Sequence, residues 1–209
     1  MADVTTIAEL GTAAGTLVLA AATFAAVRSG NRSARIAEAT LLAGLRPLLV
    51  PTRREDPPQK IGFVDDVWLV APGGGAAVDV TDDAIYLGIA IRNVGNGIAI
   101  LHGWDFHAWD DIPDDARLRL DSFHRLSRDI YIAPNDMGFW QGALRDPSSE
   151  EFEYARRSVD SGDRIVVDVL YGDERGLQRM ISRFSLTPHD ETWTATIARH
   201  WNVDAPDPR

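Results

Sequence analysis

The sequence contains no cysteine, and this absence excludes several kinds of site. A chain without thiols cannot form a disulfide scaffold, a thiol nucleophile, or a thiolate-bound metal or iron–sulfur centre. The Walker phosphate loop, the dinucleotide-binding glycine fingerprint, the zincin helix motif and the Gly-x-Ser-x-Gly elbow are also missing. We therefore predict no cofactor and no metal centre, and we assign no catalytic residue.

Basic residues are scarce in most of the chain, and Lys60 is the only lysine. Residues 1–60 carry seven basic and five acidic side chains (+2), whereas 61–209 carry 14 and 26 (−12), which sum to the net charge of −10. Nucleic-acid binding depends on Lys and Arg that neutralise phosphates. An acidic body without a basic stripe therefore argues against a nucleic-acid partner.

A stretch without any charged residue lies near the N-terminus, from Leu10 to Val27. A helix of this length crosses roughly 30 Å of hydrocarbon. Arg28, Arg32 and Arg35 follow the stretch and no basic residue precedes it, so the positive-inside rule places the C-terminal side in the cytoplasm. We expect a single-pass protein of the cytoplasmic membrane with its N-terminus outside. The alternative is an Ala-rich helix buried in a soluble core.

These patterns divide the chain into four segments. They are a short N-terminal tail (1–9), a transmembrane helix (10–28), a juxtamembrane helix (29–45) that follows a break at 29–31, and a β-domain (46–209). Gly11 and Gly15 form a Gly-x-x-x-Gly pair that lets a second helix approach closely. They predict packing of the helix with a second copy or with another membrane protein.

Downstream, the apolar pattern takes the period of two that is typical of half-buried strands. We expect one hairpin over 85–106, with its turn at 93–97. A second hairpin is expected over 165–184, with the loop at 172–175 and Asp168 paired with Arg179. Many short strands separated by turns predict a mainly β fold, an antiparallel immunoglobulin-like β-sandwich, rather than a parallel α/β sheet.

The histidines and charged clusters have ordinary structural explanations. The strand period places His102 in the core and His107 on the surface. The acidic run of Asp110, Asp111, Asp114 and Asp115 lacks the ligand alternation of a calcium loop and is interpreted as a solvated loop. Arginines at three positions are expected to form a ladder of ion pairs on the outer face of the sheet. They are Arg164, Arg179 and Arg183.

Several short stretches together resemble a loose, uncharacterised bacterial group of single-span, membrane-anchored β-sandwich proteins. Arg46-Pro47 opens a strand, and Arg92-Asn93-Val94-Gly95-Asn96-Gly97-Ile98-Ala99 lies in a turn. Further stretches are Arg128-Asp-Ile-Tyr-Ile-Ala-Pro134, Gly138-Phe-Trp-Gln-Gly142 and Arg199-His-Trp-Asn202. The resemblance spans most of the chain. It implies the architecture and no activity.

Aromatic and arginine side chains gather in one weakly periodic segment. Tyr, Trp and Arg dominate the energetics of protein interfaces. The residues predicted to bind a partner are Arg128, Tyr131, Phe139, Trp140, Gln141 and Arg145. The alternative is that Phe139 and Trp140 cap the sandwich core.

Two functions remain open from the sequence. The first is a non-catalytic, membrane-tethered cytoplasmic binding or assembly module that docks a protein partner or forms homo-oligomers. The second is a membrane-localised hydrolase that uses Asp and His residues assembled by the fold. A deep pocket that holds His and Asp within hydrogen-bond reach favours the enzyme, whereas an exposed aromatic patch without such a pocket favours the module.

Overall fold

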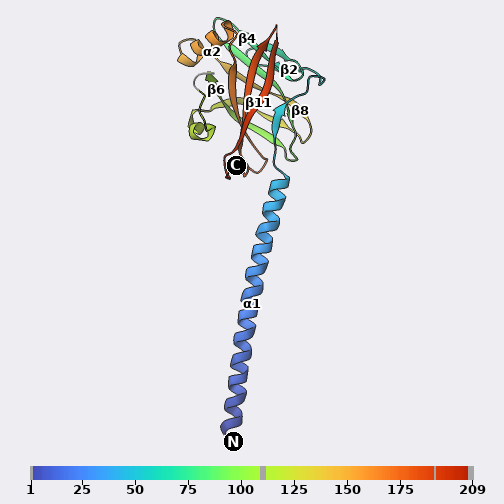
Figure 1. Cartoon of the computed structure of the whole chain (residues 1–209), viewed down its shortest axis with the longest axis vertical. Helices are drawn as coiled ribbons and strands as arrows, with labels where there is room; N and C mark the ends of the chain where they lie inside the picture. Colours follow the sequence, from blue (N-terminus) through green and yellow to red (C-terminus); the bar gives the residue numbers. More distant parts are fainter. Residues whose placement is uncertain (1, 109–111, 191, 207–209) are drawn as a thin grey trace. The chain divides into compact units, whose positions relative to one another are not determined.

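The computed structural model describes residues 2–108, 112–190 and 192–206, and it divides into two compact units, Met1–Gly44 and Leu45–Arg209. The first unit is a single helix, α1 (Ala2–Gly44). The second contains strands, a 3-10 helix and one further α-helix (Figure 1). These elements are β1 (Leu49–Pro51), β2 (Gln59–Gly62), β3 (Trp68–Ala71), β4 (Gly75–Val80), β5 (Ile85–Asn93), β6 (Ala99–Ala108), η1 (Ala116–Ser122), β7 (His124–Ile132), β8 (Met137–Leu144), α2 (Glu150–Asp160), β9 (Ile165–Gly172), β10 (Met180–His189) and β11 (Thr192–Asn202).

The helix α1 corrects two predictions made for the N-terminal segment. It runs without interruption through 29–31, where a break between two helices was expected. A single glycine inside a helix costs only about 1 kcal/mol, so Gly30 does not end a helix that has arginines and alanines in the turns before and after it. The single-pass membrane prediction was also wrong, because no helix in the described part of the chain combines enough length with enough apolar character to cross a membrane. The uncharged stretch is rich in Ala, Gly and Thr, which add length but little hydrophobicity.

The fold of the second unit is mainly β, as predicted, and is built on one curled antiparallel sheet. Its strand order is β1-β5-β4-β11-β10-β9-β6-β7, and β8 pairs with β5. The sheet curls around a single main core, to which strands from both halves and α2 contribute. Its centre includes Trp140, Phe184 and Tyr171, each with no measurable exposure.

The first predicted hairpin does not form. β5 and β6 are strands, but β5 pairs with β1, β4 and β8, and β6 pairs with β7 and β9. The segment between them therefore carries the chain from one part of the curled sheet to another. Asn93 stabilises this connecting segment. Its side-chain Nδ2 donates to Gly97 O and Ile132 O, and its Oδ1 accepts a hydrogen bond from the backbone N–H of Leu48. Turn-forming residues predict a reversal but not the strand that the chain joins afterwards.

The second predicted hairpin does form, with its register displaced. Partners in β9 and β10 sum to 351, as in Asp168↔Arg183 and Tyr171↔Met180, so each side chain lies on the predicted face but the pairing has slipped by four positions. Asp168 therefore pairs with Arg183 and not with Arg179. The connecting loop is longer than predicted. Asp173 orders it by accepting hydrogen bonds from the Leu177 and Gln178 amides.

Both faces of the sheet are covered along part of its length, which explains why several strands lose the simple alternation. The hairpin of β2 and β3 packs on the outer face of β5 and β8 and buries a second cluster that includes Ile61 and Tyr86. Its own outer face leaves Trp68 and Val70 59% exposed. A third cluster, around Ile181 and Trp201, lies beneath η1.

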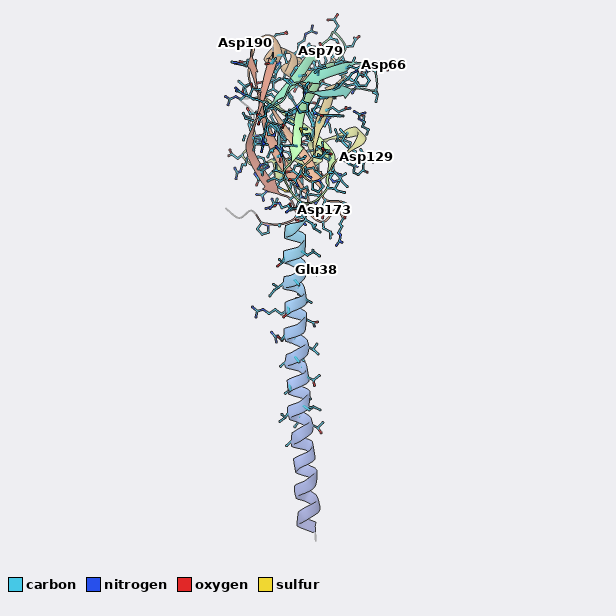
Figure 2. The ribbon with its side chains drawn as sticks, turned by 90° about the vertical axis from the view of Figure 1, so that its right-hand side faces the viewer. Glu38, Asp66, Asp79, Asp129, Asp173 and Asp190 are labelled. Carbon is cyan, nitrogen blue, oxygen red and sulfur yellow. The ribbon has the colours of Figure 1, made fainter. Side chains whose placement is uncertain are left out.

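Acidic side chains are spread over the surface of the β-unit. Figure 2 shows Asp66, Asp79 and Asp190 toward one end of this unit and Asp173 toward the other, with Asp129 between them. The negative charge is therefore a general property of this surface and not one patch.

Candidate functional site

The two strands that end the curled sheet, β7 and β8, are adjacent in sequence but do not pair with each other. Within the described residues, β7 pairs only with β6 and β8 only with β5. Each strand therefore has one edge whose backbone N–H and C=O groups are not used by a neighbouring strand. Such edges are templates for the addition of another strand.

A large bulge in β7 widens the separation between these edges. The β6–β7 register passes from Leu101↔Ile130 to Gly103↔Arg125, so residues 126–129 of β7 stand opposite one residue of β6, His102. Extra residues in one strand bend it and increase its local twist. The first half of β7 therefore turns away from β8, while the second half stays close to it.

The space left between the strands is a groove of about 160 Å³. We call it the β7–β8 groove. Leu126 and Ser127 line one side and Gly142 and Ala143 the other, with Trp104 at its base. Its rim is basic, because Arg125 and Arg145 line it and Arg128 crosses it to Gln141.

Three of the predicted partner-binding residues lie on this rim or beside it. Arg128 Nη2 donates to Gln141 Oε1 at 2.7 Å and to Gly62 O at 3.2 Å. Arg145 forms an ion pair with Asp65, with Nε 3.1 Å from Oδ2. The hydrogen bond from Arg145, and then one from Tyr86, hold the pKa of the Asp65 carboxyl below its ordinary value. Gln141 itself is buried and serves as the acceptor that orients Arg128.

The aromatic residues of the prediction are distributed differently. Trp140 has no exposure and packs edge-on against Trp104, with ring centroids 5.5 Å apart. Its side chain is unavailable to a partner, so the anchor role proposed for it is wrong and the alternative of a core residue is correct. Phe139 is half-buried beneath the Arg128 guanidinium, 5.3 Å away. Tyr131 is 61% exposed, at the end of β7 that stays close to β8.

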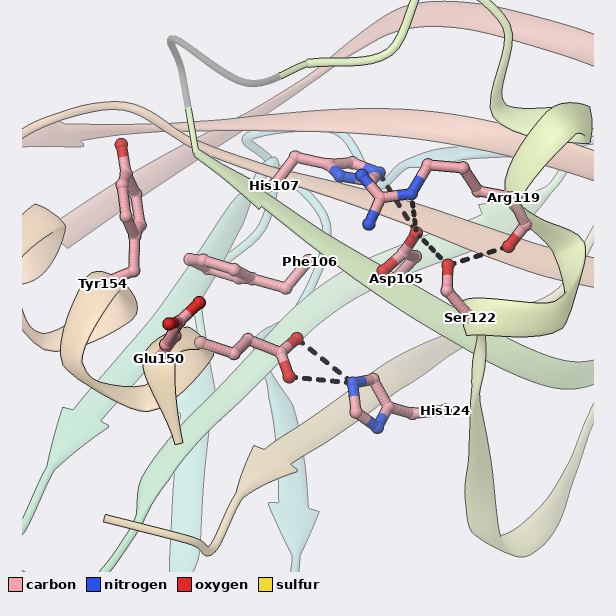
Figure 3. Close-up of a pocket in the computed structure, with 9 residues that line it drawn as sticks. Asp105, Phe106, His107, Arg119, Ser122, His124, Glu150 and Tyr154 are labelled. Atoms are coloured by element: carbon pink, nitrogen blue, oxygen red, sulfur yellow. Dashed lines mark hydrogen bonds and ion pairs between the residues drawn. The ribbon is translucent and has the colours of Figure 1, made fainter. Parts of the chain in front are cut away.

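A second, larger cavity of about 470 Å³ lies between β6, η1, the start of β7 and the first turns of α2 (Figure 3). Asp105 and His107 of β6 and Ser122 line one part of it. Glu151 and His124 line another. The criterion that favoured an enzyme, a pocket with His and Asp within hydrogen-bond reach, is met only in part: His107 Nε2 lies 3.6 Å from Asp105 Oδ2, and Asp168, which His107 does reach, is not among the described residues that line the cavity.

The positions of the two β6 histidines are the reverse of those predicted. His102 is an extra residue of β6 in the pairing with β9, where Leu101↔Tyr171 is followed by Gly103↔Leu170. This bulge in β6 shifts its alternation, so that residues 99 and 101 face the core before it and 104 and 106 after it. His102 is consequently exposed, and His107 is 3% exposed on the covered outer face. A bulge of this kind leaves no mark in the apolar pattern.

His107 belongs to a buried polar cluster with Asp168 and Arg183. Its Nε2 lies 2.9 Å from Asp168 Oδ2 and, because a carboxylate only accepts, this nitrogen carries the proton. Arg183 forms a bidentate ion pair with the same carboxylate. Its Nε donates to Oδ1 at 2.7 Å and its Nη2 donates to Oδ2 at 2.6 Å. The Asp168–Arg183 ion pair on the outer face of the sheet is thus buried, because the segment leading into η1 covers it. In that segment, Pro113 O accepts a hydrogen bond from Arg183 Nη1.

His124 connects the start of β7 to α2. Its Nε2 lies 3.0 Å from Glu151 Oε2, and this hydrogen bond is the main reason why the pKa of His124 is raised above its ordinary value. The imidazole also stacks on Trp104 at 4.7 Å. His124 lines both the groove and the larger cavity.

The remaining predicted sites give little chemistry. Asp110 and Asp111 lie outside the described residues. Asp115 caps η1 and pairs with Arg117, and no cluster of the described residues has the composition to hold a metal ion. Gly11 and Gly15 lie within α1, and nothing approaches Gly15. Their role in helix packing stays a prediction.

Sequence reasoning missed Asp105 and Arg125, and it gave Asp168 the wrong partner. The two aspartates had a signal: each stands between large apolar residues of a strand, where a charge requires a buried partner. Arg125 had none, because its importance comes only from the position of the β7 edge.

Comparisons with known proteins add no function. No family model matches the chain, and no curated protein matches it. Among solved structures, the chain is similar to the Se-Met labelled β-glucosidase from Kluyveromyces marxianus, at 11% identity and a TM-score of 0.21. The match covers 66% of this chain and 15% of that one. A TM-score this low supports no statement about fold or activity.

Proposed function

We propose that the β-unit is a non-catalytic binding module that holds an extended, acidic segment of a partner protein in the β7–β8 groove. The observation that carries the proposal is the pair of open strand edges that face each other across this groove. An extended peptide that enters there finds backbone donors and acceptors, and main-chain hydrogen bonds of this kind give strand addition its affinity. The finer description of the fold as an immunoglobulin-like sandwich is part of the same proposal.

Charge supports an acidic partner over a neutral one. Arg125, Arg128 and Arg145 surround the groove in a unit whose net charge is −10, so the groove is a basic exception on an acidic surface. Complementary charge speeds encounter and selects among partners more than it raises affinity. The arginine rim therefore accounts for selectivity, and the open edges account for binding.

The hydrolase alternative is less well supported by the cavity geometry. Ser122 Oγ donates to Asp105 Oδ2 at 2.9 Å and not to a histidine. Catalysis by a serine nucleophile needs a base within hydrogen-bond reach of that hydroxyl. Among the described residues, the serine that does contact a histidine is Ser182, with Oγ 2.7 Å from His200 Nδ1, and neither residue is among those that line this cavity. Hydrolysis stays a prediction.

The experiment that tests the binding function uses a labelled ten-residue peptide of alternating Glu and Val, measured by fluorescence anisotropy with the full chain. We expect Arg128→Ala and Arg145→Ala each to weaken binding about three- to tenfold, and added salt to weaken it further. The matched control is Arg156→Ala, which removes an exposed arginine paired with Asp82 far from the groove in sequence and should leave binding unchanged. Equal losses in all three variants would show that net charge alone attracts the peptide.

A further inference from the structure

One wall of the larger cavity has a feature that the proposed function does not use: Asp105, which belongs to a buried pair of carboxylates. Asp105 of β6 and Asp168 of β9 stand directly opposite each other in the antiparallel register. Both are buried, at 4% and 0% exposure. Like charges in directly opposed positions destabilise a sheet unless cations offset them.

Asp168 has the partners it needs. Arg183 donates to both of its oxygens and His107 donates to Oδ2, so three hydrogen bonds hold the carboxylate. Arg183 Nε and Nη2 both donate to the carboxylate of Asp168. Arg183 therefore offers no hydrogen bond to Asp105.

Asp105 is poorly compensated by comparison. Among the described residues it accepts one hydrogen bond, from the neutral hydroxyl of Ser122. The nearby cations stand beyond hydrogen-bond distance, with Arg119 Nε at 3.9 Å and His107 Nε2 at 3.6 Å. A buried ionised carboxylate is costly without donors, and this one lines an open cavity.

The rest of the cavity has the character of a site for an organic cation. Glu150 adds a negative charge to its wall, while Glu151 is paired with His124 and Arg119 adds a positive charge. Phe106 and Tyr154 add aromatic rings. Figure 3 shows Asp105, Phe106 and Tyr154 around the same space. Aromatic faces attract ammonium groups, and a volume of about 470 Å³ suits a small molecule.

We propose that this cavity binds a small organic cation, a protonated primary amine on an aromatic or aliphatic body, with its ammonium group on Asp105. The ammonium supplies the donors and the positive charge that Asp105 lacks, while its body lies against Phe106 and Tyr154. A metal ion is a poorer fit, because no cluster of the described residues has the ligands for one. The site shares His124 with the β7–β8 groove but does not depend on the function proposed for that groove.

The test is calorimetric titration of the full chain with 2-phenylethylamine and with its neutral analogue 2-phenylethanol. We expect the amine to bind at least about tenfold more tightly than the alcohol, a difference that isolates the charge. The isosteric change Asp105→Asn should abolish that preference. Glu150→Gln, at the exposed mouth, should reduce amine affinity less than about threefold.

Three results would overturn the proposal. They are equal affinity for the amine and the alcohol, undiminished amine binding by Asp105→Asn, and displacement of the amine by an equal concentration of Ca²⁺. If Asp105→Asn does not fold, Ser122→Ala takes its place. It removes the one hydrogen bond that Asp105 accepts from the described residues, so amine binding should be as tight as in the wild type or tighter, and weaker binding contradicts the proposal.

Discussion

Single residues in this protein show how strongly burial decides a role. Trp140 looked like an interface anchor because of its residue type and its neighbours. The structure places it against Trp104 with no exposure, because β8 has one face on the main core. Residue type alone could not separate these roles, since both interfaces and cores favour tryptophan.

Truncation of Trp140 should therefore affect stability. We expect Trp140→Ala to lower the free energy of unfolding by about 3–5 kcal/mol, because it removes a buried indole and leaves a cavity. Chemical denaturation measures this change. Tyr131→Ala, at a residue 61% exposed, is the control and should change stability by less than about 0.5 kcal/mol. A small effect of Trp140→Ala would contradict its place in the core.

The ion pair between His124 and Glu151 predicts a pH dependence. Since Glu151 raises the pKa of His124 in the folded state, the pair stabilises the fold fully below the unfolded pKa of about 6.5. This contribution is lost as pH rises through the raised folded pKa. Because the imidazole is 42% exposed, we expect no more than about 1 kcal/mol.

The measurement compares the wild type with Glu151→Gln by denaturation at pH 6 and pH 9. The wild type should be the more stable at pH 6, and the difference should disappear at pH 9. A difference that persists at high pH would show that Glu151 acts through packing and not through the charge of His124.

At the scale of elements, the sequence predicted strands better than it predicted their neighbours. The period of two located β5, β6, β9 and β10 and placed the facing residues of β9 and β10 correctly. It could not give the partner of β5, because the apolar pattern is the same whichever strand lies alongside. The register slip of the second hairpin has a related cause: a shift by an even number of positions, here four, keeps every side chain on its face, so only the loop geometry distinguishes the alternatives.

The register of β9 and β10 can be tested through two arginines. Arg183→Leu leaves Asp168 buried without its main cation, and we expect a loss of about 3–5 kcal/mol. Arg179, the partner that the sequence predicted, pairs instead with Asp204 and its side chain is 44% exposed. Arg179→Ala should therefore cost less than about 1 kcal/mol. Thermal and chemical denaturation of both variants measure these losses of stability. A larger loss for Arg179→Ala than for Arg183→Leu would support the register predicted from the sequence.

The candidate site was predicted only in part, for a physical reason. Arg128, Gln141 and Arg145 were chosen as a local stretch of suitable residue types, and they meet at the groove because β7 and β8 follow each other in the chain. Arg125 joins them through the bulge, and Asp105 meets Asp168 through pairing across 63 residues of sequence. Contacts of that range follow from topology and cannot be inferred from a single sequence.

At the scale of the whole molecule, the chain consists of two compact units that divide after Gly44. The β-unit has its own core clusters, formed entirely from residues after Gly44. We therefore expect a chain of residues 45–209 to fold. Its melting temperature should lie within a few degrees of that of the full protein, a shift that corresponds to about 1 kcal/mol in the free energy of unfolding. Calorimetry measures this, and failure of the shorter chain to unfold cooperatively would contradict the division.

The central claim is that backbone edges, and not charge alone, hold a partner segment in the β7–β8 groove. The most direct measurement compares the alternating Glu-Val peptide with a version that is N-methylated at every second residue, on the edge that would face β8. The two peptides carry the same side chains and charge, but the methylated one cannot donate its hydrogen bonds to the strand. We predict at least about tenfold weaker binding of the methylated peptide, together with hydrogen-exchange protection of β7 and β8 amides by the unmodified peptide only. Equal affinity, or protection confined to the exposed face around Trp68 and Val70, would contradict the account.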